Sequence, residues 1–262
     1  MLQMGLNSVS VILPTRDRGE LFMNAINSIL VQTYPNIEII IVDDFSSTPP
    51  DLSELNTNIP IHYHRNKLNL GGAKSRNIGV GLARGDFICF LDDDDEYFPE
   101  KIELLLNEFK KDDSLHVVFG KIIKKSQPYQ KIKHKYLSDR YIKTLKAVKY
   151  LHTNSSLIKR NVFNIIIFDE SLDKFQDTQL HIELITKFKC KYIFTPVAYW
   201  NDVHEKNQIT DMRTKEQYIN SINNYKKLIV SLTSSKSISY GYKFYMRLKL
   251  FYMKIIFHIK FK

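Results

Sequence analysis

Apolar runs of strand length alternate with amphipathic stretches of helical period through the first 120 residues. The runs at 8–13, 37–42, 59–63, 87–91 and 115–120 predict strands, and the stretches 20–32, 72–83 and 99–110 predict helices. The strands are apolar at nearly every position, which is typical of parallel strands buried on both faces. We therefore expect an α/β fold with a Rossmann-like, mostly parallel sheet and helices on both faces.

The second half of the chain is less regular. We expect an extended polar segment at 121–140, helices at 141–151, 177–189 and 215–232, and strands at 155–158 and 191–198. Residues 233–241 have the composition of a linker, and 242–262 predict a basic, aromatic helix. The expected organisation is one domain over 1–232, with halves 1–120 and 121–232, followed by a linker and an amphipathic helical extension over 233–262.

The charge of the chain is unevenly distributed. Its 38 Lys and Arg against 28 Asp and Glu give a net charge of +10. Residues 217–262 hold nine Lys or Arg and no acid, and residues 121–149 hold ten against one. Such an asymmetric basic tail points to an anionic membrane or a nucleic acid as a partner.

Cysteine usage and the N-terminus suggest a reduced, cytoplasmic setting. Two cysteines in 262 residues argue against a disulfide framework, and Cys89 and Cys190 are expected as buried free thiols. Residues 1–8 lack the basic and apolar regions of a signal peptide, and no run of about 18 uncharged apolar residues predicts a spanning helix.

Four consecutive carboxylates, Asp92 to Asp95, directly follow the predicted strand 87–91. A solvated surface run is one interpretation of such a cluster. The strand, however, places it at the edge of the sheet where parallel α/β folds bind ligands. Carboxylate oxygens suit Mg²⁺ or Mn²⁺, which are usually held by one or two carboxylates together with phosphate oxygens. The cluster therefore predicts a metal-bound diphosphate ligand.

Two further segments end in polar residues at the same predicted edge. Asp43 follows the strand 37–42 and is either a turn residue or an acceptor for a ring N–H or a ribose hydroxyl. Residues 69–77 form a glycine-containing entry into a helix, with Lys74 and Arg76 nearby. Such a helix start can hold a phosphate, although the pattern is common.

Five segments together resemble one family. They are Val9–Thr15, Ser28–Tyr34, Glu38–Asp44, Ala73–Gly79 and Gly85–Asp95. In this order they resemble the family 2 inverting glycosyltransferases, which adopt the nucleotide-sugar-binding GT-A fold. The resemblance covers residues 8–100, is looser over 100–210 and hardly includes the tail.

The resemblance implies roles for individual positions. Substrate-binding residues would be Pro14, Thr15, Arg16, Asp43, Gly72, Arg76, Asp92 and Asp93. Thr15 and its loop would contact the base and Asp43 would bind uracil, while Asp94 would be the direct ligand of Mn²⁺ or Mg²⁺. Similar enzymes often carry an aromatic residue where this chain has Arg16, which can also stack on a base.

Catalysis of this type needs one more carboxylate, which deprotonates the acceptor hydroxyl. Gln176-Asp177 stands where the family usually has Glu-Asp, so Asp177 would be the base; the alternative is a helix N-cap. His204 would complete the metal shell or approach the diphosphate, unless it is a structural or exposed histidine. Asn154 and Ser155 could line the acceptor side.

The C-terminal helix has an apolar arc. At 100° per residue, an arc of about 140° contains Phe244, Tyr245, Leu248, Phe251, Tyr252, Ile255, Ile256 and Ile259. Outside it fall Lys243, Arg247, Lys249, Lys254 and Lys260, but also Met246, Leu250, Met253 and Phe257. A basic amphipathic helix with aromatic content favours an anionic membrane surface. The alternatives are packing on the domain and, without a recognition motif, nucleic acid.

We therefore expect an inverting hexosyl- or N-acetylhexosaminyltransferase that uses a UDP-sugar. The resemblance and the tail imply an undecaprenyl-diphosphate-linked glycan acceptor, a role in bacterial capsule or lipopolysaccharide synthesis, and a peripheral location on the cytoplasmic face of the inner membrane. No nucleic-acid partner is expected. The alternatives are an inactive nucleotide-sugar-binding membrane module and a metal-dependent nucleotidyltransferase, for which a Gly-x-x-x-x-Gly-Lys loop is missing.

Overall fold

The computed structural model describes residues 7–53, 55–127, 142, 145–203, 214–234 and 238–261. The strands are β1 (Val9–Thr15), β2 (Ile37–Asp43), β3 (Ile61–Arg65), β4 (Phe87–Phe90), β5 (Glu96–Tyr97), β6 (Val117–Lys124), β7 (Ser156–Lys159) and β8 (Cys190–Trp200). The α-helices are α1 (Glu20–Leu30), α2 (Gly72–Leu82), α3 (Lys101–Lys111), α4 (Gln176–Lys187), α5 (Lys215–Ser234) and α6 (Tyr240–Lys260), and the 3-10 helices are Leu145–Tyr150, Thr153–Ser155 and Arg160–Asn164.

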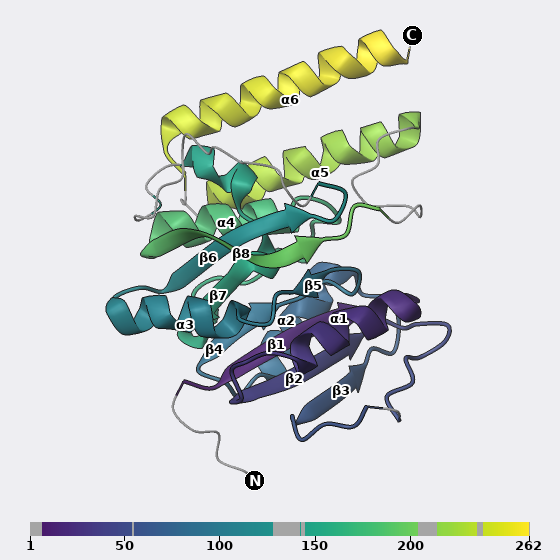
Figure 1. Cartoon of the computed structure of the whole chain (residues 1–262). Helices are drawn as coiled ribbons and strands as arrows, with labels where there is room; N and C mark the ends of the chain where they lie inside the picture. The colour runs from purple at the N-terminus through teal and green to yellow at the C-terminus, as the bar shows by residue number, and fades with distance from the viewer. Residues whose placement is uncertain are drawn as a thin grey trace.

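The strands form one sheet in the order β3-β2-β1-β4-β7-β6-β8-β5. The pairings within β3-β2-β1-β4 are parallel, as is β6 with β8. β7 runs antiparallel between β4 and β6, and β5 is antiparallel to β8. The predicted α/β fold with a mostly parallel sheet is thus confirmed, with the antiparallel pairings confined to its second half (Figure 1).

The two faces of the sheet explain why its strands lack polar alternation. In β1, Val11 and Leu13 join a core with α1 and α3, while Ile12 points into a second core with α2 and α4. In β2, Ile39 and Ile40 divide between the two cores in the same way. Because side chains alternate across a strand, burial on both faces demands an unbroken apolar run.

Several predictions for the second half were wrong in detail. β6 extends to Lys124, so residues 121–124 belong to a strand rather than to a polar excursion. The helix predicted over 141–151 is a 3-10 helix over Leu145–Tyr150. Most of 125–144 lies outside the described residues.

The C-terminal helix packs against the rest of the chain. α6 runs along α5 (Figure 1) and shares a third apolar core with it, in which Met246 of α6 meets Leu228 and Leu232 of α5. Ile182 of α4 joins this core from below. The predicted domain boundary at residue 232 therefore stays a prediction, since α6 shares an apolar core with α5 and α4. No helix among the described residues has the length and apolar content to span a bilayer.

Two glycines of α2 should respond in opposite ways to alanine. A Cβ at Gly79 would lie 2.4 Å from Cγ2 of Ile12, whereas a Cβ at Gly81 would meet no atom within 4 Å. Gly79→Ala should lower the free energy of unfolding by about 1–3 kcal/mol through overpacking. Gly81→Ala should raise it by about 0.5–1 kcal/mol through helix propensity and a less flexible unfolded chain. Denaturant unfolding of both variants measures this, and equal effects would contradict the close packing of α2 on β1.

Candidate functional site

Three parallel strands end side by side, and their following loops are joined. Thr15 at the end of β1 pairs with Asp43 at the end of β2, and Ile12 pairs with Phe90 at the end of β4. The N–H of Asp44 donates to the carbonyl of Thr15 at 2.9 Å. This register brings the residues predicted from three separate segments to one edge of the sheet.

Asp93 ties the acidic cluster to the loop after β1. Its carboxylate accepts hydrogen bonds from the backbone N–H of Arg16 and from Nε of Arg18, both at 3.0 Å. Arg18 also lies 3.2 Å from a carboxylate oxygen of Asp94. Burial raises the pKa of Asp93 to about 6, with Asp94 adding to the effect and Arg18 opposing it. Arg18 was not singled out from the sequence, and it pairs with two of the four aspartates.

Arg76 joins the acidic cluster to α4. Its guanidinium donates to Asp92 at 2.5 Å and to the amide oxygen of Gln176 at 3.3 Å. Nε of Arg76 is buried without a hydrogen-bond partner. A Cβ at Gly72 would lie 2.9 Å from this guanidinium, so the glycine leaves Arg76 room to fold back over the start of α2. Burial alone would lower the pKa of Arg76, but Asp92 and Asp177 outweigh it and raise the pKa.

Asp177 arrives at the site from the second half of the chain. It lies in the first turn of α4, half-buried, and its charge acts on Arg76. Phe175 precedes the helix with a φ of 68°, and α4 has no side-chain hydrogen bond at its N-cap. Asp177 lies inside the helix and Phe175 is at the N-cap. The alternative prediction, that Asp177 is the N-cap residue, was therefore wrong. Its neighbour Gln176 accepts a hydrogen bond from Arg76, so the start of α4 brings Asp177 near the guanidinium that pairs with Asp92.

Asp95 has a different environment from its three neighbours. It is buried, accepts from the backbone N–H of Asn201 at 2.8 Å, and is hydrogen-bonded by the side chain of Asn154. The same Asn154 amide donates to Asp92 at 3.2 Å. Burial, reinforced by Asp92, raises the pKa of Asp95 to about 8. Asp95 thus anchors the cluster to the 3-10 helix Thr153–Ser155 and to the residue that follows β8.

Asp43 is enclosed by its own loop and by β3. Its side chain is fully buried and accepts from the N–H of Ser46 at 2.8 Å and from the hydroxyl of Tyr63 at 2.7 Å, and Arg65 lies 3.5 Å away. Tyr63 and Phe45 are both about half-exposed and offer aromatic surface at this edge.

The remaining predicted residues divide into three groups. Pro14 is half-buried and Thr15 buried at the end of β1, while the side chain of Arg16 is exposed and pairs with Asp17. Asn154 and Ser155 are fully buried, so neither presents a surface for an acceptor in this state. His204 lies outside the described residues.

The acidic cluster has suitable donors for a divalent cation, although the described residues contain no group of three His, Cys, Asp or Glu side chains arranged around one. The side chains of Asp92 and Asp94 are 25% and 18% exposed at the sheet edge. In proteins, Mg²⁺ or Mn²⁺ is commonly bound by one or two carboxylates, and phosphate oxygens of the substrate provide further ligands. The residues therefore fit such an ion bound together with a diphosphate.

A comparison with protein families identifies this arrangement. Residues 10–167, more than half of the chain, match the sequence profile described as glycosyl transferase family 2. The chain belongs to glycosyl transferase family 2. The matched residues contain the ends of β1, β2 and β4 and both arginines of the site, whereas Asp177 lies beyond them.

Individual family 2 relatives extend the likeness over more of the chain. The amylovoran biosynthesis glycosyltransferase AmsB of Erwinia amylovora is 27% identical over 214 residues, covering 75% of this chain and 70% of AmsB. The chain matches only part of three other relatives, namely 30%, 37% and 20% of their lengths. The structure of S. aureus TarS 1–349 in complex with UDP-GlcNAc superposes with a TM-score of 0.72 at 17% identity, over 97% of this chain and 73% of TarS.

A second solved structure has a similar fold. The mannosyltransferase PcManGT of Pyrobaculum calidifontis, in complex with GDP-Man and Mn²⁺, has a TM-score of 0.59 at 13% identity, over 88% of this chain and 65% of that one. At these identities the likeness shows the fold, which agrees with the expected GT-A architecture.

A buried histidine behind the site should make stability pH-dependent. His181 of α4 is buried, with Nε2 3.3 Å from the Thr153 hydroxyl, and burial lowers its pKa to about 4 against an opposing effect of Asp177. Between pH 6.5 and 4 the unfolded chain then binds more protons, so stability falls as pH falls. The loss from this residue should be about 2–3 kcal/mol between pH 7 and 4.5. Chemical unfolding of wild type and His181→Gln at both pH values isolates it, and equal losses would contradict the assignment.

Proposed function

We propose that this chain transfers a hexosyl or N-acetylhexosaminyl group from a UDP-sugar to a hydroxyl of a glycan, with inversion at the anomeric carbon. Membership of glycosyl transferase family 2 supports sugar transfer. UDP-GlcNAc in the similar fold of TarS supports a uridine donor. The name of AmsB supports a role in polysaccharide biosynthesis.

One observation carries the proposal: Arg76 of α2 pairs with Asp92, which follows β4, and hydrogen-bonds Gln176 beside Asp177 at the start of α4. An arginine with carboxylates from two different elements, at the ligand-binding edge of a parallel sheet, supports a site for a charged ligand. A sugar transferase of this kind needs positive charge at the diphosphate and a separate carboxylate at the acceptor hydroxyl.

The donor diphosphate would lie against Arg76. Asp92 and Gln176 occupy two of the guanidinium N–H groups, and its buried Nε has no partner. Hydrogen-bond donors therefore remain for phosphate oxygens. Asp94 and Asp92 would hold Mn²⁺ or Mg²⁺, which would supply charge neutralisation at the departing diphosphate. The Mn²⁺ bound in PcManGT supports this cofactor class.

The chemical step assigned to this chain is a single displacement. Asp177 accepts the proton of the acceptor hydroxyl while the oxygen of that hydroxyl forms a bond to the anomeric carbon. The bond from that carbon to the diphosphate oxygen breaks, and its electron pair leaves with UDP beside Arg76. Attack from the face opposite to the leaving group inverts the anomeric centre.

The acceptor in this proposal is a glycan linked to undecaprenyl diphosphate on the cytoplasmic face of the bacterial inner membrane. It follows from the proposed role in capsule or lipopolysaccharide synthesis, and from the basic tail, which suits an enzyme that works at a lipid surface.

The test is release of nucleoside diphosphate from a panel of UDP-, GDP- and dTDP-sugars, with a bacterial lipid extract as the acceptor source, in Mn²⁺ and in EDTA. We expect acceptor-dependent UDP release from one or a few UDP-sugars in Mn²⁺ only. Donor binding without release by any panel member would indicate an inactive binding module. Formation of diphosphate from a sugar phosphate and UTP would indicate a nucleotidyltransferase instead.

A further inference from the structure

α6 has two apolar faces, and the structure uses one of them. Met246 is 1% exposed, and Tyr242, Leu250 and Met253 lie beside it on the face that packs against α5. Phe257 extends this inner face toward Tyr218 of α5, with ring centroids 6.0 Å apart. The apolar residues that fell outside the predicted arc are therefore the ones that attach the helix to the fold.

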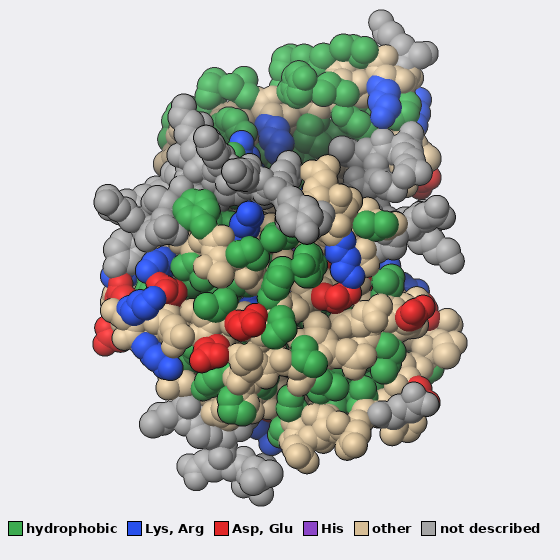
Figure 2. Space-filling view, in the orientation of Figure 1, with side chains coloured by type: hydrophobic (Ala, Val, Ile, Leu, Met, Phe, Trp, Pro, Cys, Tyr) green, Lys and Arg blue, Asp and Glu red, His purple; other side chains and the backbone are tan. Residues whose placement is uncertain are grey.

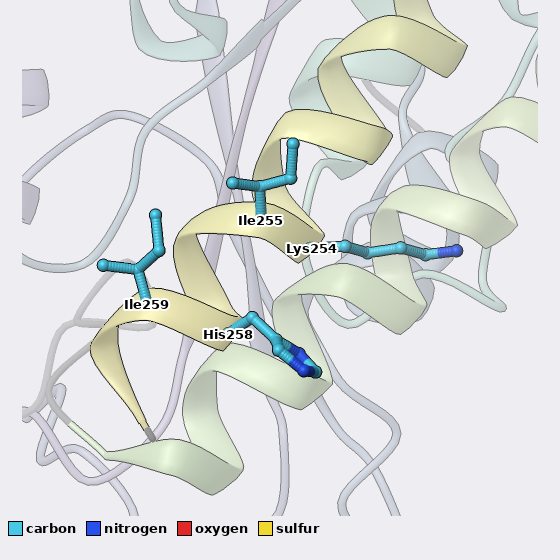
Figure 3. Close-up of a pocket in the computed structure, with 4 residues that line it drawn as sticks. All are labelled: Lys254, Ile255, His258 and Ile259. Atoms are coloured by element: carbon cyan, nitrogen blue, oxygen red, sulfur yellow. The ribbon is translucent and has the colours of Figure 1, made fainter.

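The opposite face of α6, here called the outer face, is apolar and exposed. It consists of Phe244, Tyr245, Leu248, Phe251, Tyr252, Ile255 and Ile259, which are between 39% and 75% exposed. Hydrophobic side chains gather over α6 in Figure 2. In Figure 3, Ile255 and Ile259 point to one side of the helix, away from Lys254 and His258. So much exposed aromatic and aliphatic surface on one helix indicates a binding surface.

Positive charge lies along one border of the outer face. At 100° per residue, Lys243, Arg247 and Lys254 lie along this border. On the other side, Lys249 and Lys260 are turned toward α5, with Nζ 5.2 Å from the Tyr225 ring centroid and 5.9 Å from that of Tyr218. α6 contains no Asp or Glu. Long basic side chains at such a border can extend their charges toward anionic groups while their stems remain on apolar surface.

We propose that the outer face of α6 binds the surface of an anionic lipid bilayer. The helix lies parallel to the surface. Its aromatic and aliphatic side chains lie at the boundary between headgroups and acyl chains, and its basic border faces lipid phosphates. The charge of α6 favours this occupant over a second copy of the chain, because two such faces would bring like charges together. The inner face fixes the helix to α5, so the bilayer would meet the protein in one orientation.

This inference deepens the proposed function, which rests on work at a lipid surface, but its residues are separate from those of the candidate site. Binding to lipid can be measured without donor, acceptor or turnover. A failure of sugar transfer would leave it unaffected, and a failure of lipid binding would leave the family 2 chemistry unaffected.

The experiment is co-sedimentation of the full chain with vesicles of phosphatidylcholine alone or mixed with phosphatidylglycerol. The outer-face variant is Phe244→Ser with Phe251→Ser, and the charge variant is Arg247→Gln with Lys254→Gln. Val230→Ser, which removes an apolar side chain 66% exposed on α5, is the matched control. Thermal unfolding of every variant checks that the fold is retained.

We expect binding to the anionic vesicles that weakens in high salt, because exposed charges are screened over about 10 Å at 0.1 M ionic strength. Each double variant should bind about tenfold more weakly or worse, and the control as wild type. Unchanged binding of both double variants would overturn the proposal. So would equal binding to neutral vesicles at any salt, or a change from dimer to monomer in the outer-face variant, which would assign the face to a second copy.

Discussion

Replacement of Asp177 by asparagine should lower turnover by about 100-fold or more while leaving donor affinity nearly unchanged. Asparagine has almost the same shape but cannot accept the proton of the acceptor hydroxyl. Arg76 would still be held by Asp92 and Gln176, so the proposed diphosphate contacts should persist. Single-turnover transfer and titration of UDP measure the two quantities separately.

The exposed Asp173, in the loop that precedes α4, provides a matched control. Asp173→Asn removes a carboxylate four residues away and should leave turnover unchanged. Gln176→Glu, which restores the acidic pair usual in similar enzymes, should retain activity because a carboxylate there can also pair with Arg76. Loss of UDP affinity with retained turnover in Asp177→Asn would show that Asp177 binds the donor and is not the base.

Replacement of Asp94 by alanine should abolish metal-dependent transfer and leave the fold intact. The side chain is 18% exposed and pairs with Arg18, which remains paired with Asp93 in the variant. Loss of a metal worth several kcal/mol in the transition state should lower turnover by about 10²–10³-fold. Rates measured over a range of Mn²⁺ concentrations, together with thermal unfolding, test this.

Asp113→Ala serves as the control for Asp94, because Asp113 is an exposed aspartate in the loop before β6. It should retain the wild-type response to Mn²⁺. Full activity of Asp94→Ala in EDTA would remove the metal assignment altogether, whereas a shift of the response toward higher Mn²⁺ would indicate that Asp92 alone retains the ion.

The half of the fold that carries the site could be predicted because its signals are local. β1 and β2 are apolar at most positions, and only a strand covered on both faces buries nearly every residue. The order of strand and helix then fixes parallel pairing, which places Asp43 and Asp92 at one edge. Periodicity also located α4, and with it Asp177.

The partners within the site could not be predicted, because they connect residues far apart in the sequence. Arg18 meets Asp93 across 75 positions, and Asn154 meets Asp92 across 62. Neither contact produces a periodic pattern in the sequence from which it could be predicted. β6 was placed too short because Lys121 and Lys124 are only half-buried and interrupt its apolar run. The enclosure of Asp43 depends on Tyr63 of the neighbouring strand and was likewise missed.

α6 illustrates how an imperfect pattern carried information. The apolar residues outside the arc did not fit the predicted amphipathic pattern. Two of them, Met246 and Leu250, lie on the face that packs on α5. Removal of residues after Ser239 would uncover Leu228 and Leu232, so a truncated chain would lose stability and lipid binding together. Substitutions confined to the outer face avoid this ambiguity.

The central claim is that a nucleotide-sugar diphosphate lies between Arg76, the acidic cluster and Asp177. A crystal structure of Asp177→Asn with a UDP-sugar and Mn²⁺ tests it most directly, since the variant should hold an intact donor. We predict diphosphate oxygens on Arg76 and on a Mn²⁺ ion bound by Asp94, with the anomeric carbon facing Asn at position 177 across space for an acceptor hydroxyl. A donor bound away from the ends of β1, β2 and β4, or an anomeric carbon turned away from position 177, would contradict the account.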